Sequence, residues 1–190
     1  MKPVLTFMAG TILLLSGTTV MADEYGDAIG LFRHAGESAS FFEHCYGYAV
    51  FPSIGKGGLI VGAAHGKGHV YEHGKYIGDT SMTQLSVGFE AGGQAYSQII
   101  FFEDQQSFED FTAGDFEFGA DASAVAITAA AAGTASTAGV EAEASGGMQD
   151  ATTAGGYVKG LATFKIIKGG AMAEASVAGE KFSFRRRAQE

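Results

Sequence analysis

Residues 48–76 read "YAVFPSIGKGGLIVGAAHGKGHVYEHGKY", a stretch in which short apolar runs alternate with glycines, lysines and histidines. The runs "YAVF", "GGLIVGAA" and "GHVYE" are rich in β-branched and aromatic residues, which favour strands. The segments "AHGKGH" and "EHGKY" contain glycine and are typical of hairpin connections. This stretch therefore predicts an antiparallel meander.

The same pattern of short β-branched and aromatic runs with glycine continues through "KYIGD" and "TQLSVGFEAGGQAYSQIIFFE". Several glycines fall inside these predicted strands, where glycine usually marks a bulge, a sharp bend or a close approach of two backbones. These interior glycines are Gly62, Gly88, Gly92 and Gly93.

Two segments have helical patterns. Apolar residues recur at helical spacing from Tyr25 to Phe42, which predicts an amphipathic helix that packs on the domain. The segment "EDQQSFEDFTAG" predicts a short helix near residues 104–113. Asp104 is its N-cap, Phe108 and Phe111 share one face, and a glycine at 114 ends it.

Residues 115–147 are dominated by alanine, glycine and threonine, and alternation in "SAVAIT" and "GVEAEAS" predicts strands there. "YVKGLATFKIIKGGAMAEASVAGEKFSF" then predicts three further strands. The expected fold class is α+β and mostly antiparallel β. It is a single compact β-rich domain with a meander or barrel-like sheet, an N-terminal amphipathic helix and the short helix near residues 104–113.

The first 22 residues, "MKPVLTFMAGTILLLSGTTVMA", have the pattern of a secretory signal peptide, with Lys2 ahead of an apolar run that is short for a membrane span. We expect cleavage after Ala22, which leaves residues 23–190 as one domain in the periplasm or secreted, peripheral to a membrane. Cys45 is the single cysteine, so no internal disulfide forms. We interpret it as a small buried hydrophobe, with a reactive thiol as the alternative.

The formal net charge of -9 argues against nucleic-acid binding, which needs basic side chains to displace counterions. The charge is unevenly distributed. Residues 101–157 contain ten acidic and no basic residues, whereas residues 158–187 contain seven basic residues and two acidic ones. The fold can therefore present a positive face. Alternatively, the terminal "RRR" only keeps the chain end soluble.

Catalytic and cofactor motifs are absent from the sequence. Neither Gly55-Lys56 nor Gly66-Lys67 has the upstream glycine or the following hydroxyl of a phosphate-binding loop, and there is no Gly-x-Ser-x-Gly. We therefore predict that the protein is not an enzyme and needs no cofactor.

Three histidines have a spacing that could form a metal site. His65, His69 and His73 are four residues apart and would share one face of a continuous strand. Such a set can ligate zinc or copper. The intervening glycines predict turns instead, so exposed hairpin histidines are the preferred interpretation and a metal site is the weaker one.

The residues also carry a family resemblance. "GYAVFPSIGKGGLIVGAAHGKGHVY" resembles the opening signature of the SYLF domain (DUF500) family: a strand ending in Phe-Pro, a Lys-Gly-Gly, then glycine-spaced strands and a second Gly-Lys-Gly. "VGFEAGGQAYSQIIFF" is similar to the family's Gly-x-x-x-Gly-x-Gln strand, and "FTAGDFEFGADASAVA" to its Phe-x-x-Gly-x-Asp-Ala-Ser segment. The resemblance covers about residues 25 to 180. The chain departs from the family in its alanine-rich run and its "FSFRRRAQE" end.

This resemblance implies lipid binding. The basic positions Lys56 and Lys67, which we place at turns, and Lys159 in "YVKG" match the family's pattern. With Lys165 and Lys168 of the basic C-terminal segment, they are the expected lipid-binding residues. The expected function is that of a non-enzymatic protein that associates with anionic phospholipid at a membrane surface from the periplasm. The alternative is a soluble periplasmic structural or partner-binding module without lipid specificity.

Overall fold

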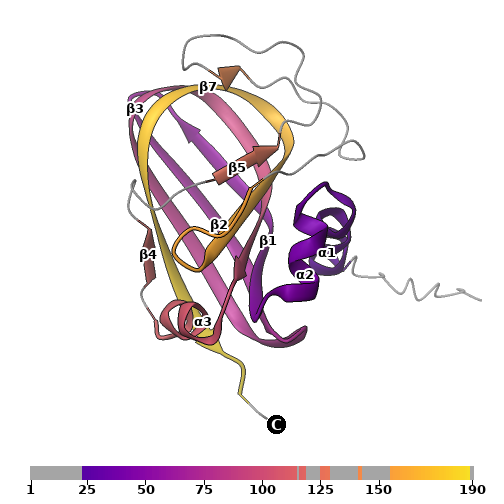
Figure 1. The fold of residues 1–190 in the computed structure, drawn as a ribbon. Helices are drawn as coiled ribbons and strands as arrows, with labels where there is room; N and C mark the ends of the chain where they lie inside the picture. The colour runs from indigo at the N-terminus through magenta and orange to yellow at the C-terminus, as the bar shows by residue number, and fades with distance from the viewer. Residues whose placement is uncertain (1–22, 115, 119–124, 129–140, 143–154, 189–190) are drawn as a thin grey trace, which may run out of the picture.

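The computed structural model describes residues 23–114, 116–118, 125–128, 141–142 and 155–188. Within these residues the chain forms three helices and one sheet of seven strands, which confirms the predicted α+β class (Figure 1). The elements in chain order are α1 (Glu24–His34), α2 (Ser38–His44), β1 (Gly47–Gly58), β2 (Val61–Glu72), β3 (Lys75–Phe102), α3 (Gln105–Thr112), β4 (Phe116–Phe118), β5 (Val125–Thr128), β6 (Glu141–Ala142) and β7 (Leu161–Arg186).

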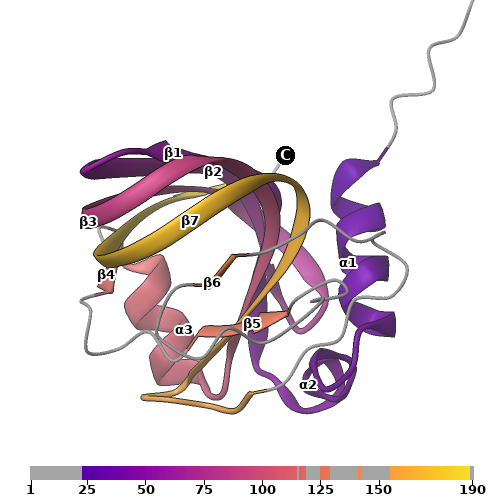
Figure 2. The same cartoon turned by 90° about the horizontal axis from the view of Figure 1, so that it is seen from above.

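The sheet is organised around the long strand β3, which pairs with three other strands. Its first half pairs with β2 as far as Val87, and its second half, from Gly92, pairs with β1. Along its other edge β3 pairs with β7 over almost its whole length. Because β1 also pairs with β2, the two halves of β3 must turn toward each other, and the sheet curls (Figures 1 and 2).

The bend in β3 depends on glycine. Gly88 and Gly92 have φ angles of 147° and 126°, a region that residues with a Cβ rarely adopt. At Gly62 a Cβ would overlap the carboxylate of Glu90. The sequence prediction of bends and close approach is therefore confirmed at Gly62, Gly88 and Gly92, whereas a Cβ at Gly93 would make only an ordinary contact, 3.5 Å from the Lys56 carbonyl oxygen.

Where β1 begins and β3 ends, both surfaces of the sheet are covered, and this creates two apolar clusters. On the inner side, Phe51 and Phe102 pack with Phe108 and Phe111 of α3. On the outer side, α1 and α2 cover neighbouring positions of the same strands (Figure 2). Successive side chains of a strand point to opposite faces. Because both faces are buried here, "YAVF" and "IIFF" are apolar at every position.

The N-terminal helical pattern forms two helices instead of the single helix predicted for residues 25–42. Gly36 separates α1 from α2 with a φ of 49°. The Ser38 hydroxyl is buried and donates hydrogen bonds to the carbonyls of Phe32 and Ala35. It therefore supplies a partner for carbonyl groups at the C-terminal end of α1. No helix in the described part of the chain is long and apolar enough to cross a membrane.

The short helix α3 agrees with the prediction. The Asp104 side chain accepts a hydrogen bond from the Ser107 amide at 2.8 Å, and Ser107 completes the capping box. Phe108 and Phe111 are buried on one face of the helix, and Gly114 follows with a φ of 140°.

Several predicted strand boundaries were wrong, in each case because a glycine-rich segment continues a strand. "EHGKY" is a hairpin with positive φ at His73 and Gly74, as predicted, but "AHGKGH" lies within β2. The three strands predicted at the C-terminus are one strand, β7, in which Gly170 has a φ of 98°. "SAVAIT" and "GVEAEAS" contain β5 and β6, while the rest of residues 119–154 lies outside the described residues.

We expect Gly92→Val to lower the free energy of unfolding by about 1–3 kcal/mol, because valine must adopt a φ that its branched Cβ disfavours. Gly55→Ala is the control, since a Cβ there has nothing within 4 Å and should change stability by less than about 0.5 kcal/mol. Chemical denaturation of both variants measures this difference. Equal stability of the two variants would show that the bend does not require glycine.

Candidate functional site

One end of the sheet exposes large apolar side chains. Leu59 and Ile60 form the turn between β1 and β2, and they are 71% and 75% exposed. Exposed apolar side chains of the adjoining β2 and β3 extend this surface. We call it the apolar tip, and its residues are Leu59, Ile60, Val61, Leu85, Val87 and Phe89.

The apolar tip is fixed to the sheet by backbone hydrogen bonds. The Glu90 amide donates to the Leu59 carbonyl at 2.6 Å, and the Gly88 amide donates to the Ile60 carbonyl at 3.0 Å. Val61 of β2 lies opposite Val87 of β3. Short turns usually contain glycine, asparagine or aspartate, so a Leu-Ile turn is not explained by turn geometry. It is typical of a surface that contacts something apolar.

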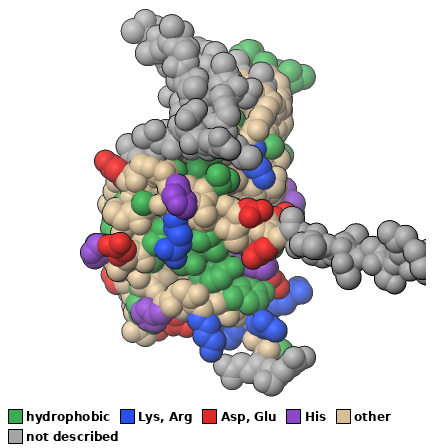
Figure 3. Space-filling view, turned by 90° about the vertical axis from the view of Figure 1, so that its right-hand side faces the viewer, with side chains coloured by type: hydrophobic (Ala, Val, Ile, Leu, Met, Phe, Trp, Pro, Cys, Tyr) green, Lys and Arg blue, Asp and Glu red, His purple; other side chains and the backbone are tan. Residues whose placement is uncertain are grey.

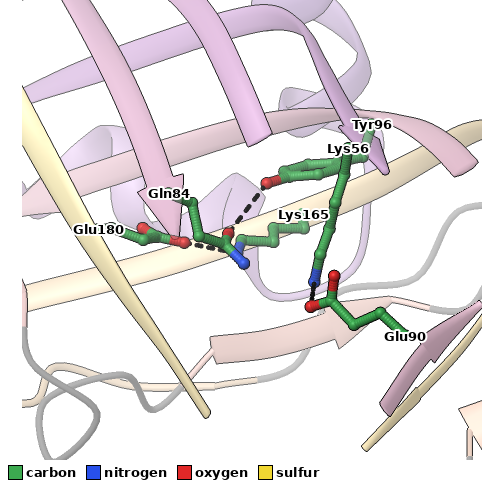
Figure 4. Close-up of polar contacts among 6 residues, drawn as sticks. All are labelled: Lys56, Gln84, Glu90, Tyr96, Lys165 and Glu180. Atoms are coloured by element: carbon green, nitrogen blue, oxygen red, sulfur yellow. Dashed lines mark hydrogen bonds and ion pairs between the residues drawn. The ribbon is translucent and has the colours of Figure 1, made fainter. Parts of the chain in front are cut away.

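The charged residues of β1, β2 and β3 nearest the apolar tip point into the sheet. Between residues 54 and 66 and between residues 82 and 95, the only Lys, Arg, Asp or Glu residues are Lys56 and Glu90. The Lys56 Nζ lies 3.5 Å from the Glu90 Oε1, and the two side chains are 6% and 0% exposed (Figure 4). The prediction of an exposed Lys56 at a turn was wrong, because β1 continues to Gly58 and its alternation directs Lys56 inward.

A second ion pair lies in the interior of the curled sheet. The Lys165 Nζ is 2.9 Å from the Glu180 Oε1, and it also lies 5.2 Å from the centre of the Tyr96 ring (Figure 4). The Tyr96 hydroxyl donates to the Gln84 side chain at 3.5 Å. The interior is therefore apolar beside α3 and polar toward the apolar tip. Lys165 is directed into this interior, away from any surface where it was expected to meet lipid.

The three other predicted lysines stay on the outside, on different elements. Lys67 is exposed within β2, opposite Ser81, and not at the turn where we placed it. Lys159 occupies a tight turn with a φ of 53°, and the Lys168 Nζ donates to the Pro52 carbonyl at 3.2 Å. The structure therefore does not gather the five predicted lysines into one site. Sequence reasoning missed the apolar tip, although the unusual "LIV" after Gly-Gly was a signal for it.

Other basic side chains lie at the opposite end of the sheet. Lys75 and the arginines at 185, 186 and 187 are exposed, and Figure 3 shows Lys and Arg side chains gathered beside the C-terminus. Arg186 is paired with Gly78, and the distance along β3 from there to Val87 is about 30 Å. The basic end and the apolar tip are therefore separate surfaces.

The three histidines take different positions. The glycines at 66 and 68 do not interrupt β2, contrary to our prediction of turns between the histidines. His69 stacks on Tyr25 with ring centres 3.4 Å apart, and its Nε2 lies 3.3 Å from the Asp79 Oδ1. His73 sits in the hairpin turn. Among the described residues, no three His, Cys, Asp or Glu side chains are grouped so that they could hold a metal ion.

Cys45 caps the C-terminal end of α2 and packs against the outer apolar cluster. It is half-buried, so it is less enclosed than the sequence interpretation expected. Burial is the main cause that raises the pKa of the thiol. A raised pKa lowers the thiolate fraction at neutral pH, which makes this cysteine a poor nucleophile.

We expect His69 to make stability depend on pH. Burial lowers its pKa below the ordinary value of about 6.5, although Asp79 opposes this shift. The unfolded chain therefore takes up a proton at a higher pH than the folded chain, and stability falls as the pH drops through this range. The melting temperature of the wild type should fall more between about pH 7.5 and about pH 5 than that of His69→Phe. Parallel melting profiles would contradict this.

We expect Lys56→Glu to lower the free energy of unfolding by about 3–5 kcal/mol, because it places a second carboxylate beside the buried Glu90. Lys67→Glu makes the same charge change on the exposed side of β2 and should cost less than about 0.5 kcal/mol. Urea denaturation of the two variants is the measurement. A similar cost at both positions would mean that Lys56 is not held in the interior.

Comparison with known proteins places this architecture in a family. The family model "Ysc84: Las17-binding protein actin regulator" matches residues 83–190, more than half of the chain. Beta cell expansion factor A of Aeromonas veronii is 28% identical over 156 residues, which are 81% of this chain and 51% of that protein. The chain therefore spans about half the length of this relative. The SYLF resemblance of the sequence is confirmed, and the chain belongs to the Ysc84 family.

Proposed function

We propose that this protein is a non-enzymatic lipid-binding protein that associates with a membrane surface containing anionic phospholipid. The observation that carries the proposal is the apolar tip, where six large apolar side chains are 58% to 75% exposed on an ordered end of the sheet. A surface of this kind on a soluble domain marks a contact with an apolar phase or partner.

The magnitudes favour apolar contact over attraction by the lysines. Burying a fully exposed Val, Leu, Ile or Phe side chain contributes about 1.5–3 kcal/mol, so the partly exposed residues of the tip contribute about 1–2 kcal/mol each. A basic side chain near an anionic membrane contributes about 1 kcal/mol. Burial of the six apolar residues therefore contributes more to the free energy of binding than the exposed lysines do. Of these lysines, Lys67 lies on a strand that also contributes to the tip.

Lys67 still gives a reason for anionic lipid. It lies six residues from Val61 along β2, a distance of about 20 Å. When the tip reaches the acyl chains, Lys67 lies at the outer boundary of the headgroups, where anionic phosphates attract it. We expect a modest preference for anionic vesicles and a modest weakening by salt.

The family supports a binding role. The matched family is described as an actin regulator that binds Las17, and neither that description nor the name of the Aeromonas relative denotes an enzyme. Residues 1–22 would direct the chain to the periplasm. Because the family description names a protein partner, a partner-binding module is the second candidate, and the apolar tip would then contact protein.

We expect wild-type protein without residues 1–22 to co-sediment with phosphatidylglycerol-containing vesicles, and Val87→Asp to weaken this binding by at least about tenfold, because a charge must enter an apolar environment. Thr83→Asp is the matched control: it adds the same charge to the exposed side of β3 outside the tip and should bind like the wild type.

A wild type that fails to sediment with neutral or anionic vesicles at any salt concentration would refute lipid binding and leave the partner-binding module. Equal losses in Val87→Asp and Thr83→Asp would place the contact elsewhere than the tip.

A further inference from the structure

The exposed side chains of the apolar tip are arranged around a central pair. Val61 of β2 lies opposite Val87 of β3, and the exposed Leu85 and Phe89 lie on either side of Val87 along β3. Ala63 is exposed opposite Leu85 and extends the apolar surface by one position. Val87 therefore occupies the centre of an apolar surface that two neighbouring strands present to the outside.

The border of this surface is polar. His65 and Thr83 are the next exposed pair along β2 and β3, and the His65 Nδ1 lies 3.3 Å from the Thr83 Oγ1. In the register with β7, the positions opposite the three apolar β3 residues are uncharged: Ala175, Val177 and Gly179. The charged positions lie beyond both ends of this row: Glu174 opposite Glu90, and Glu180 and Lys181 opposite Gln84 and Thr83. An apolar centre with a polar rim is typical of a protein–protein interface.

The exposed area is close to that of an interface. A large side chain has about 150 Å² or more of accessible surface, so six side chains that are 58% to 75% exposed present on the order of 600 Å². The largest apolar patch on a typical monomer covers about 300–600 Å², and a stable interface covers about 800 Å² on each partner. The tip is therefore at the upper limit for a surface that stays in water, and it supplies most of one side of an interface.

A second copy of the chain fits this surface because the surface is compatible with itself. In a two-fold contact each copy meets the same surface of the other, so a charged group near the centre would meet its own like charge. The six tip residues are all uncharged. If the β3 strands of the two copies run antiparallel across the contact, the exposed Lys67 side chains are directed away from each other. Two tips can therefore pack with neither like charges nor unpaired polar side chains at the centre.

We propose that the apolar tip is also a self-association surface, and that two copies cover each other's tips in solution through this antiparallel two-fold contact, centred near Val87. Because the contact area is smaller than that of a standard interface, the dimer is weak, with a dissociation constant of about 1–100 µM. The dimer itself does not depend on lipid. One consequence rests on the proposed function: the same side chains cannot face a second copy and a bilayer at once, so membrane binding separates the dimer.

The first test is sedimentation equilibrium of the protein without residues 1–22, under reducing conditions that prevent a disulfide through Cys45. The wild type should pass from monomer to dimer between about 1 and about 200 µM. Val87→Asp should weaken the dimer by at least about a hundredfold, because the two-fold contact brings two carboxylates together in an apolar surrounding. Ser81→Asp is the matched control: it adds the same charge on the same side of β3, about 20 Å from Val87, and should dimerise like the wild type.

The second test locates the contact and its release by the membrane. In a Cys45→Ser background, a short bismaleimide should cross-link two copies of Val87→Cys. It should not cross-link Ser81→Cys, whose two thiols lie about 40 Å apart across an antiparallel contact centred near Val87. Vesicles of phosphatidylcholine with phosphatidylglycerol should lower the cross-linked fraction of Val87→Cys by about fivefold or more, because lipid in excess competes by mass action. Circular dichroism establishes that each variant is folded at the temperature of the assay.

A wild type that stays monomeric at the highest concentration would overturn the inference and leave lipid binding intact. The same holds if Val87→Asp dimerises as well as Ser81→Asp, or if the two cysteine variants cross-link equally. A dimer that forms as expected, in a protein that does not sediment with vesicles, would support self-association and refute the proposed function instead. Cross-linking of Val87→Cys that persists in vesicle-bound protein would show that lipid and the second copy do not share the tip. The wild-type sedimentation decides the existence of the dimer even if a variant does not fold.

Discussion

Strand β3 makes hydrogen bonds with β2 over its first half and with β1 over its second half, and β1 and β2 pair with each other. A straight strand cannot satisfy both partners, so β3 must bend between Val87 and Gly92. Positive φ angles at Gly88 and Gly92 make the bend possible. Strand β7 follows β3 along its other edge, and its own positive-φ glycine, Gly170, lies opposite Gln94, just past the bend. The curl of the whole sheet follows from this pairing.

The curl divides the inner side into two environments. Near α3, aromatic side chains such as Phe102, Phe108 and Phe111 fill the space and form an apolar core. Toward the bend, backbones approach closely at the glycines, and the space holds ion pairs and a buried glutamine instead. Because charges are directed inward at the bend, the outer surface there is left to aliphatic side chains and Phe89. The exposed apolar tip and the buried charges are thus two results of one bend.

The distribution of charge gives the molecule two different ends. Exposed basic residues gather near the C-terminus, beside the start of β3, and the apolar tip lies at the bend in the middle of β3. A flat membrane that receives the tip does not meet the arginines at the same time, since they are about 30 Å away along the sheet. The net charge of -9 therefore says little about how this protein meets a surface. Under the proposed function, the local composition of the end that contacts the membrane matters more than the total charge.

The sequence alone determined the class of the fold, the α3 helix with its Asp104 cap, the "EHGKY" hairpin and the family, because these depend on local patterns within a few residues. It did not determine that β3 and β7 are single long strands, or which side of β1 Lys56 occupies. A glycine in a strand pattern is compatible with a turn and with a bend, and only pairing with distant strands selects between them. That pairing sets the alternation of side chains, and the alternation buried Lys56 and Lys165 and exposed Val61, Val87 and Phe89.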